Sequence, residues 1–403
     1  MPSPDLDSCT TASTLASYRA DLERRAFEEQ LRRCRVVEPV ADGEPMQVWV
    51  EGRLAVNFSS NDYLGLSLDE RLQAAAMDAI RRYGTGSSAS RLISGTSELV
   101  RDLEQALAAF KHTESALVFN SGYQANVAIL QAILQPGDWV FCDKLNHASL
   151  VDGCLLSGAR WTRYRHLDLN HLEQKLTKAP AEGRRWIITD TVFSMDGDYP
   201  DLQTLLEISE RHHALVMVDE AHATGLYGER SSSGLCEQLG VSKRVALQMG
   251  TFSKALGGAG AYVAGSQVLI DTLINQARGF IYSTALPPAT IAAARQAIEV
   301  VQNDHSLKQR LWDNVAFFEE TLRTLGLAER FTLPFKSPII PVLIGDSGET
   351  LRISQALLEA GYFVQGIRPP TVPPGTARLR IALSAAHTRE QLKGLAQALA
   401  TLL

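Results

Sequence analysis

The feature that most constrains the fold is a series of short runs between residues 116 and 264 that are apolar throughout. Polar residues or Gly-Asp pairs bound these runs, and helical stretches separate most of them. Continuously apolar strands are typical of a sheet buried on both faces, and helices between such strands favour parallel crossover connections. The runs are 116–119, 139–142, 186–189, 215–218, 245–248 and 261–264. They predict an α/β fold whose sheet is mostly parallel.

The rest of the chain is arranged around this core. Apolar residues at helical spacing predict helices at 18–31, 71–82, 97–110 and 124–134, and β-like segments lie at 47–50 and 54–58. Beyond residue 285, helices at 290–325 and 350–360 and strands at 338–344 and 377–383 predict a smaller α+β unit. We therefore expect an N-terminal helical and β segment (1–55), a large α/β domain (56–285) and a small C-terminal α+β domain (286–403).

Composition excludes several classes of protein. The 403 residues carry a net charge of −6 and no long run of Lys and Arg, so a nucleic-acid partner is not expected. No apolar stretch reaches the roughly 18 residues of a membrane helix, and the N-terminus lacks the basic and apolar regions of a secretory signal. The five cysteines are scattered without a C-x-x-C pair, which favours reduced thiols over a metal site. We expect a cytoplasmic protein with no membrane or metal partner.

Two segments with reactive side chains follow buried strands. Asp219 and His222 come directly after the run 215–218, and Lys254 lies among Gly, Ser and Thr after the run 245–248. In open α/β sheets, ligands bind beyond the carboxyl ends of the strands. Pyridoxal 5′-phosphate (PLP) needs such a set: a lysine for a Schiff base, a carboxylate for the ring nitrogen and small donors for the phosphate. Either segment alone is more often a satisfied turn or a surface lysine, so the prediction of a PLP site rests on the two together.

Five motifs carry a resemblance to a known family. They are Asn61-Asp-Tyr-Leu-Gly-Leu, Asn120-Ser-Gly-Tyr-Gln-Ala-Asn, Asn146-His-Ala-Ser, Asp219-Glu-Ala-His-Ala-Thr-Gly and Gly250-Thr-Phe-Ser-Lys-Ala. From about residue 30 to the C-terminus the chain resembles the α-oxoamine synthases, fold-type I PLP-dependent transferases that join an amino acid to an acyl thioester. The resemblance implies a large PLP-binding domain, a smaller C-terminal α+β domain and a homodimer. Ser253 departs from the pattern, because many relatives carry glycine before the lysine.

The resemblance also implies roles for single residues. Lys254 would form the Schiff base and act as general base, Asp219 would pair with the ring nitrogen, and His147 would stack on the ring and orient the thioester. His222 would hold the 3-oxygen of the cofactor and polarise the attacked carbonyl. The remaining expected cofactor ligands are Ser194 at the 3-oxygen, Gly122, Tyr123 and Thr251 at the phosphate, and Ser283 and Thr284 at the phosphate of the neighbouring subunit's cofactor.

The segment Gly366-Ile-Arg-Pro-Pro-Thr-Val-Pro points to one branch of the family. It resembles the branch that condenses L-alanine with a pimeloyl thioester, carried on coenzyme A or on acyl carrier protein, with loss of CO2, in biotin biosynthesis. The implied substrate ligands are Thr371, Arg380 at the amino-acid carboxylate, and Arg32, with Arg33 as the alternative to Arg32. Without the resemblance, Arg378 and Arg380 would equally fit two solvent-facing residues on a half-buried strand. A glycine-using synthase and a non-catalytic subunit on the same scaffold are the alternatives.

Overall fold

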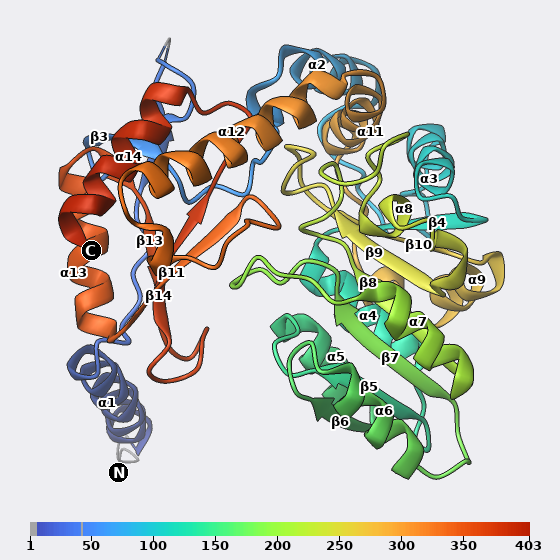
Figure 1. The fold of residues 1–403 in the computed structure, drawn as a ribbon. Helices are drawn as coiled ribbons and strands as arrows, with labels where there is room; N and C mark the ends of the chain where they lie inside the picture. Colours follow the sequence, from blue (N-terminus) through green and yellow to red (C-terminus); the bar gives the residue numbers. More distant parts are fainter. Residues whose placement is uncertain (1–5, 42) are drawn as a thin grey trace, which may run out of the picture.

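The computed structural model describes residues 6–41 and 43–403, with side chains from residue 14 onward. The described chain forms two lobes that lie side by side (Figure 1). One lobe contains a large sheet with helices around it. The other contains the C-terminal elements together with the N-terminal segment.

A seven-stranded sheet forms the larger lobe, in the order β4-β10-β9-β8-β7-β5-β6. All pairs from β9 to β6 are parallel, whereas β10 runs antiparallel to both β4 and β9. The mostly parallel sheet that the sequence predicts is therefore confirmed. Its strands are β4 (Ser115–Phe119), β5 (Trp139–Asp143), β6 (Arg160–Tyr164), β7 (Arg185–Asp190), β8 (Ala214–Asp219), β9 (Leu247–Thr251) and β10 (Ala261–Gly265).

Both faces of this sheet are buried, as the continuously apolar runs predict. On β5, Val140 and Cys142 point to a core shared with α4, α5 and α9, whereas Phe141 points to the opposite core, formed with α6 and α7. Near β4 and β10, α3 and α11 cover this second face, and α2 packs against α11. These helices are α2 (Glu70–Tyr83), α3 (Glu98–Phe110), α4 (Gly122–Ile133), α5 (Ala148–Ser157), α6 (Leu169–Lys178), α7 (Leu202–Arg211), α9 (Gln267–Gln276) and α11 (Pro288–Asn303), with the short α8 (Leu235–Gln238) and α10 (Arg278–Ile281) between them.

The second lobe is built on a three-stranded antiparallel sheet in the order β11-β14-β13. Its strands are β11 (Ile339–Gly345), β13 (Gln365–Ile367) and β14 (Ala377–Ala382). Three helices share a core with this sheet: α12 (His305–Thr324), α13 (Ser347–Glu359) and α14 (Arg389–Leu402).

The N-terminal segment joins this lobe through β-pairing. After α1 (Leu6–Phe27), the strands β1 (Val37–Pro39), β2 (Gln47–Val50) and β3 (Arg53–Asn57) form an antiparallel sheet. Then β3 pairs in parallel with β12 (Tyr362–Phe363). The two ends of the sequence are thus parts of one lobe.

Several elements differ from the prediction: the helix expected at 18–31 is α1 and ends at Phe27, and the short strands β1, β12 and β13 were not predicted. The single helix expected at 290–325 is two helices, because Asp304 leaves the helical conformation and its N–H bonds back to Val300 to close α11. The edge strand β6 was not predicted, because its exposed arginines, Arg160 and Arg163, interrupt any apolar run. The division at residues 55 and 285 stays a prediction; α11, just beyond the second limit, lies against α2 of the larger lobe (Figure 1).

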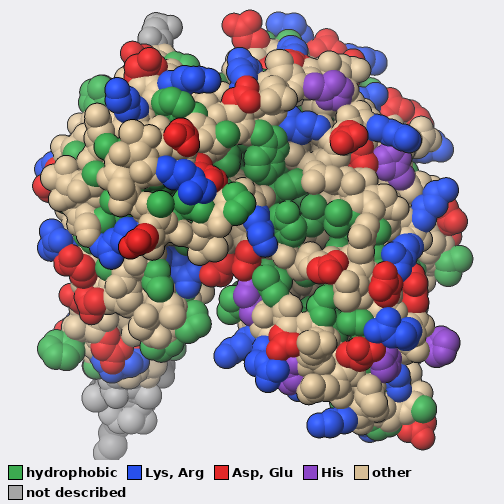
Figure 2. All heavy atoms as spheres, viewed as in Figure 1, with side chains coloured by type: hydrophobic (Ala, Val, Ile, Leu, Met, Phe, Trp, Pro, Cys, Tyr) green, Lys and Arg blue, Asp and Glu red, His purple; other side chains and the backbone are tan. Residues whose placement is uncertain are grey.

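In the part of the chain that the structure describes, no helix is both long and apolar enough to cross a membrane. On the face shown in Figure 2, Lys and Arg side chains alternate with Asp and Glu over both lobes and do not gather into one band. This distribution agrees with the absence of a basic run in the sequence.

Candidate active site

A cavity of about 180 Å³ lies where β5, β7, β8 and β9 end. Ligands of parallel sheets bind at this edge. The cavity brings together seven of the residues singled out from the sequence, namely Gly122, Tyr123, His147, Asp219, His222, Thr251 and Lys254. The other lining residues are Asn126, Ser149, Asp190, Ala221, Met249 and Ser253.

Asp219 is the last residue of β8 and its side chain is held from two sides. Nδ2 of Asn126 donates a hydrogen bond of 2.8 Å to Oδ2, and the backbone N–H of Ala221 donates one of 2.9 Å to Oδ1. The residue is only 4% exposed. Hydrogen bonds to both oxygens stabilise a buried carboxylate, so Asp219 can place a fixed negative charge in the cavity.

Lys254 follows β9 and is partly buried beside this carboxylate. Burial lowers the pKa of Lys254 from the usual 10.5 to about 8, although the negative charge of Asp219 opposes the shift. The positive charge of Arg380 lowers this pKa further. An amine with this pKa is substantially neutral near pH 8, and a neutral amine is the form that acts as nucleophile or base.

His222 takes part in a hydrogen-bonded chain that reaches the second lobe. Its Nδ1 lies 2.7 Å from the hydroxyl of Tyr63, and that oxygen accepts a bond of 3.3 Å from Nη2 of Arg380 on β14. Burial, together with repulsion from Lys254 and Arg380, holds the pKa of His222 well below its usual value. The imidazole is therefore neutral at physiological pH, so it can donate and accept one hydrogen bond each.

Arg380 is only 6% exposed, which rules out the solvent-facing alternative for this strand. Its Nε donates a bond of 2.6 Å to the carbonyl of Ser194, and Nη2 donates one of 3.1 Å to Oδ1 of Asn61. Among the described residues, no carboxylate forms an ion pair with it, whereas the neighbouring Arg378 pairs with Asp196. Within the described part of the chain, the guanidinium of Arg380 is therefore a buried cation without a counter-ion.

His147 caps the N-terminus of α5 beside the cavity. Its backbone N–H donates a bond of 3.0 Å to Oδ2 of Asp190, and its Nδ1 lies 2.7 Å from the hydroxyl of Ser149. These two contacts fix both the backbone and the ring of His147.

The N-terminus of α4 and the end of β9 form another side of the cavity. The backbone N–H groups of Gly122 and Tyr123 open α4 and have no acceptor within the helix, which is the arrangement that binds phosphate. A side chain at Gly122 would narrow this part of the cavity, since a Cβ there would lie 3.2 Å from Cε of Met249. Oγ1 of Thr251 lies 2.7 Å from the hydroxyl of Ser253. Ser253, which departs from the family pattern, therefore adds a second hydroxyl beside Thr251 and does not close the site.

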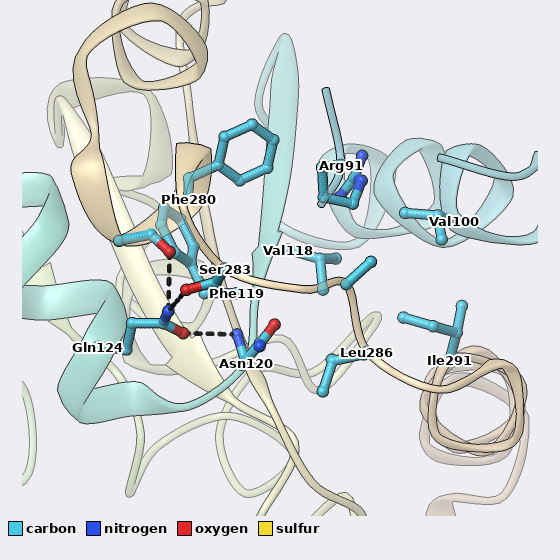
Figure 3. A pocket seen from close by; sticks show the side chains of 12 residues that line it. Arg91, Val100, Val118, Phe119, Asn120, Gln124, Phe280, Ser283, Leu286 and Ile291 are labelled. Carbon is cyan, nitrogen blue, oxygen red and sulfur yellow. Dashed lines mark hydrogen bonds between the residues drawn. The ribbon is translucent and has the colours of Figure 1, made fainter. Parts of the chain in front are cut away.

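Three of the expected cofactor ligands do not line this cavity. Ser194 lies in the loop after β7, where its carbonyl accepts from Arg380. Ser283 and Thr284 lie between α10 and α11. Ser283 lines a separate small pocket, where Nε2 of Gln124 donates to its hydroxyl (Figure 3). The carbonyl of Thr284 accepts a bond of 2.8 Å from Asn120.

The expected acyl ligands lie together at a groove between the N-terminal segment and the second lobe. Nη2 of Arg32 donates a hydrogen bond of 2.9 Å to Oγ1 of Thr371. Arg33, the alternative to Arg32, lines the same groove, as do Arg35 and Arg368. Gln365 on β13 lines the groove and pairs with Arg380 on the neighbouring strand β14. The groove therefore lies next to the strand that carries Arg380.

Comparison with known proteins places this site in a family. Residues 54–399 match the model of the class I and II aminotransferases. A curated relative from Geobacter sulfurreducens, named 8-amino-7-oxononanoate synthase, is 50% identical over 368 residues, which are 91% of this chain and 93% of the relative. The chain belongs to the 8-amino-7-oxononanoate synthase family.

Solved structures agree with this family. The 8-amino-7-oxononanoate synthase from Francisella tularensis matches with a TM-score of 0.74 at 29% identity, covering 86% of this chain and 97% of that chain. A variant of serine palmitoyltransferase from S. paucimobilis, solved with a bound PLP–myriocin aldimine, matches with a TM-score of 0.89 at 29% identity, covering 97% of each chain. The fold-type I architecture and the dependence on PLP that the sequence predicts are confirmed.

The cavity of this 8-amino-7-oxononanoate synthase family member fits PLP. A lysine of lowered pKa, a held carboxylate and a helix N-terminus with free N–H groups lie around one space of suitable size. The sequence did not assign roles to Asn126, Ser149, Asp190 or Tyr63. Asn126, Ser149 and Tyr63 lie within the quoted motifs. Asp190 lies outside them, but it directly follows the apolar run 186–189, and this position after a predicted strand could have identified it.

Proposed function

We propose that this chain catalyses the condensation of L-alanine with a pimeloyl thioester to give 8-amino-7-oxononanoate, CO2 and the free thiol. A carbon–carbon bond forms between the α-carbon of alanine and the thioester carbonyl, and the carbon–sulfur bond breaks. The bond from the α-carbon to the carboxylate then breaks with release of CO2, and a proton returns to the α-carbon. The names of the curated relatives support this reaction.

The structural observation that carries the proposal is Arg380. A buried guanidinium that forms no ion pair among the described residues suits a substrate carboxylate. Nε and Nη2 already donate to Ser194, Asn61 and Tyr63, so the carboxylate would bind at Nη1. Its charge acts on Lys254, so an amino acid bound there by its carboxylate is close to the amine. Tyr63 and Asn61 hold the guanidinium in place.

We assign the cofactor to the residues around the cavity. Lys254 would hold PLP through its amine, Asp219 at the ring nitrogen, and Gly122, Tyr123 and Thr251 at the phosphate. PLP, when bound, supplies an electron sink for the negative charge that forms at the α-carbon. Lys254 removes the α-proton as general base and returns a proton after CO2 has left.

The two histidines act as neutral groups in this scheme. His147, fixed by Asp190 and Ser149, orients the reacting groups over the cavity. His222, kept neutral by burial, donates a hydrogen bond to the oxygen that gains charge when the thioester is attacked. Arg32 and Thr371 bind the acyl donor in the groove beside β13.

We further propose a homodimer in the cytoplasm. Ser283 and Thr284 lie outside the cavity of their own chain. The adjacent Tyr282 is 71% exposed, and Ile93, three residues after the Ser90 that bridges to Thr284, is 81% exposed. A second copy packed on this region would cover the apolar surface and receive the two hydroxyl groups at its own cofactor. The described cysteines Cys34, Cys142, Cys154 and Cys236 are all free thiols, which suits a reducing compartment; the side chain of Cys9 lies outside the described residues.

Titration of the purified PLP-loaded protein tests the reaction. L-Alanine should change the visible absorbance of the bound cofactor, and adding pimeloyl thioester on coenzyme A or on acyl carrier protein should release CO2 and thiol in equal amounts. A response to glycine alone would assign the chain to a glycine-using synthase. Failure to bind PLP at all would point to a non-catalytic subunit. For the dimer, mixing a Lys254→Ala chain with a Ser283→Ala/Thr284→Ala chain should restore part of the activity that each lacks.

A further inference from the structure

The carboxyl groups of Asp190 and Asp219 both line the cavity, and the proposed reaction uses the negative charge of Asp219 alone. Asp190 ends β7 and Asp219 ends β8, and the parallel register pairs these two residues directly. Each is 4% exposed, and both line the cavity. Two neighbouring carboxylates removed from water repel each other, so one of them holds a proton.

The hydrogen bonds decide which one it is. Asp219 receives an amide N–H from Asn126 and a backbone N–H from Ala221, one on each oxygen. Asp190 receives one N–H, from the backbone of His147. The better-supplied carboxyl stays ionised, and the other one keeps its proton.

The negative charges around Asp190 also favour its protonated form, and the positive charge of Lys254 opposes them. Asp143 at the end of β5 and Asp219 on β8 are negative neighbours, Lys254 after β9 is the positive one, and His147 before α5 supplies the backbone donor. Burial, followed by the charge of Asp219, raises the pKa of Asp190 well above its usual range.

We propose that Asp190 keeps its carboxyl proton in the working enzyme and is a positioning residue that holds His147 beside the cavity through the His147 backbone N–H. Its neutrality leaves a single negative charge, that of Asp219, for a cationic ring nitrogen. It also means that Lys254 lies near one carboxylate and not two. A second carboxylate would raise the pKa of the Lys254 amine and slow its action as a base. The inference rests on the proposed PLP site, but it does not depend on which substrates are condensed.

The test compares Asp190→Asn with the parent chain, both loaded with PLP, by thermal unfolding between pH 5 and 8. A folded-state pKa above the unfolded value of about 3.9 means that the folded chain binds more protons, so the parent loses stability as pH rises through this range. Asparagine has the shape and neutrality of the protonated acid. Asp190→Asn should therefore unfold at a higher temperature than the parent, by a margin that grows with pH. Asp78→Asn, at an exposed carboxyl, should show no such growth.

A second measurement addresses His147. Asparagine keeps an oxygen that accepts from the His147 N–H, whereas alanine does not. Asp190→Ala should bind PLP about fivefold more weakly than Asp190→Asn, the effect of one lost hydrogen bond. A lower unfolding temperature for Asp190→Asn at every pH would show an ionised Asp190, and equal PLP binding by the two variants would remove the positioning role. If both results hold while alanine and thioester give no product, the reaction is wrong and the role of Asp190 stands.

Discussion

Arg32, just after α1, donates a hydrogen bond of 2.9 Å to Oγ1 of Thr371 in the loop before β14. The two side chains lie 339 positions apart in the sequence, and both line the groove beside β13. A cation held by a hydroxyl in this way is ready to bind an anionic or carbonyl group of an acyl donor.

Replacement of Thr371 by valine keeps the size of the side chain and removes the oxygen that holds Arg32. We expect Thr371→Val to raise the KM for the pimeloyl thioester about fivefold, since one hydrogen bond is lost, with little change in the KM for alanine. Arg32→Ala should raise the same KM more strongly, and the double variant should add little to Arg32→Ala. Arg33→Ala is the matched control; if it has the larger effect, the acyl contact belongs to Arg33.

Arg380→Lys keeps the charge and loses the planar guanidinium, which is held by its bonds to Ser194, Asn61 and Tyr63 and leaves Nη1 for the carboxylate. The KM for L-alanine should rise about 10- to 100-fold, the range for a hydrogen bond to a charged group. Arg378→Lys is the control on the same strand, because it loosens the pair with Asp196 and should lower the unfolding temperature without a comparable rise in this KM. An unchanged KM for alanine in Arg380→Lys would place the carboxylate elsewhere.

Tyr63→Phe removes the hydroxyl between His222 and Arg380 while leaving the ring in the core. Both partners lose a buried hydrogen bond, so kcat/KM for alanine should fall about tenfold. Tyr227→Phe removes a hydroxyl that donates to the carbonyl of Lys336, away from the cavity, and it should leave this ratio close to that of the parent. Equal losses in the two variants would mean that the hydroxyl of Tyr63 contributes to stability alone.

The pKa of Lys254 predicts how the PLP-free chain takes up its cofactor. The neutral amine reacts and the ammonium does not, so the rate of PLP capture should rise with pH and level off above a midpoint of about 8. Stopped-flow absorbance measures this rate. Lys243→Ala, at an exposed lysine, should show the same midpoint, and Lys254→Ala should show no covalent capture. A midpoint near 10.5 would contradict the effect of burial.

The sequence predicts the cavity better than its surroundings. Asp219 and Lys254 were identified because reactive side chains follow buried strands, and that pattern is local in the sequence. The bond from Tyr63 to His222 and the one from Asn126 to Asp219 join residues on different elements, so no spacing reveals them. Asp190 was missed for a further reason: its importance comes from its register with Asp219 on the neighbouring strand, which only the folded sheet defines. The edge strand β6 lacks a second buried neighbour and therefore lacks the apolar run that marks the inner strands.

The parallel pair between β3 and β12 has a consequence for how the protein is made. Val56 on β3 pairs with Tyr362 on β12, and Tyr362 leaves the ribosome only after some 300 further residues have been added. At about 5 to 20 residues per second, this takes roughly 15 to 60 s. Before that interval ends, every strand of the large sheet has been synthesised, while the N-terminal strands still have an unpaired edge. Translation order thus requires the first-made segment to be among the last to reach its final place, and a chaperone that shields exposed strand edges would be needed most at this stage.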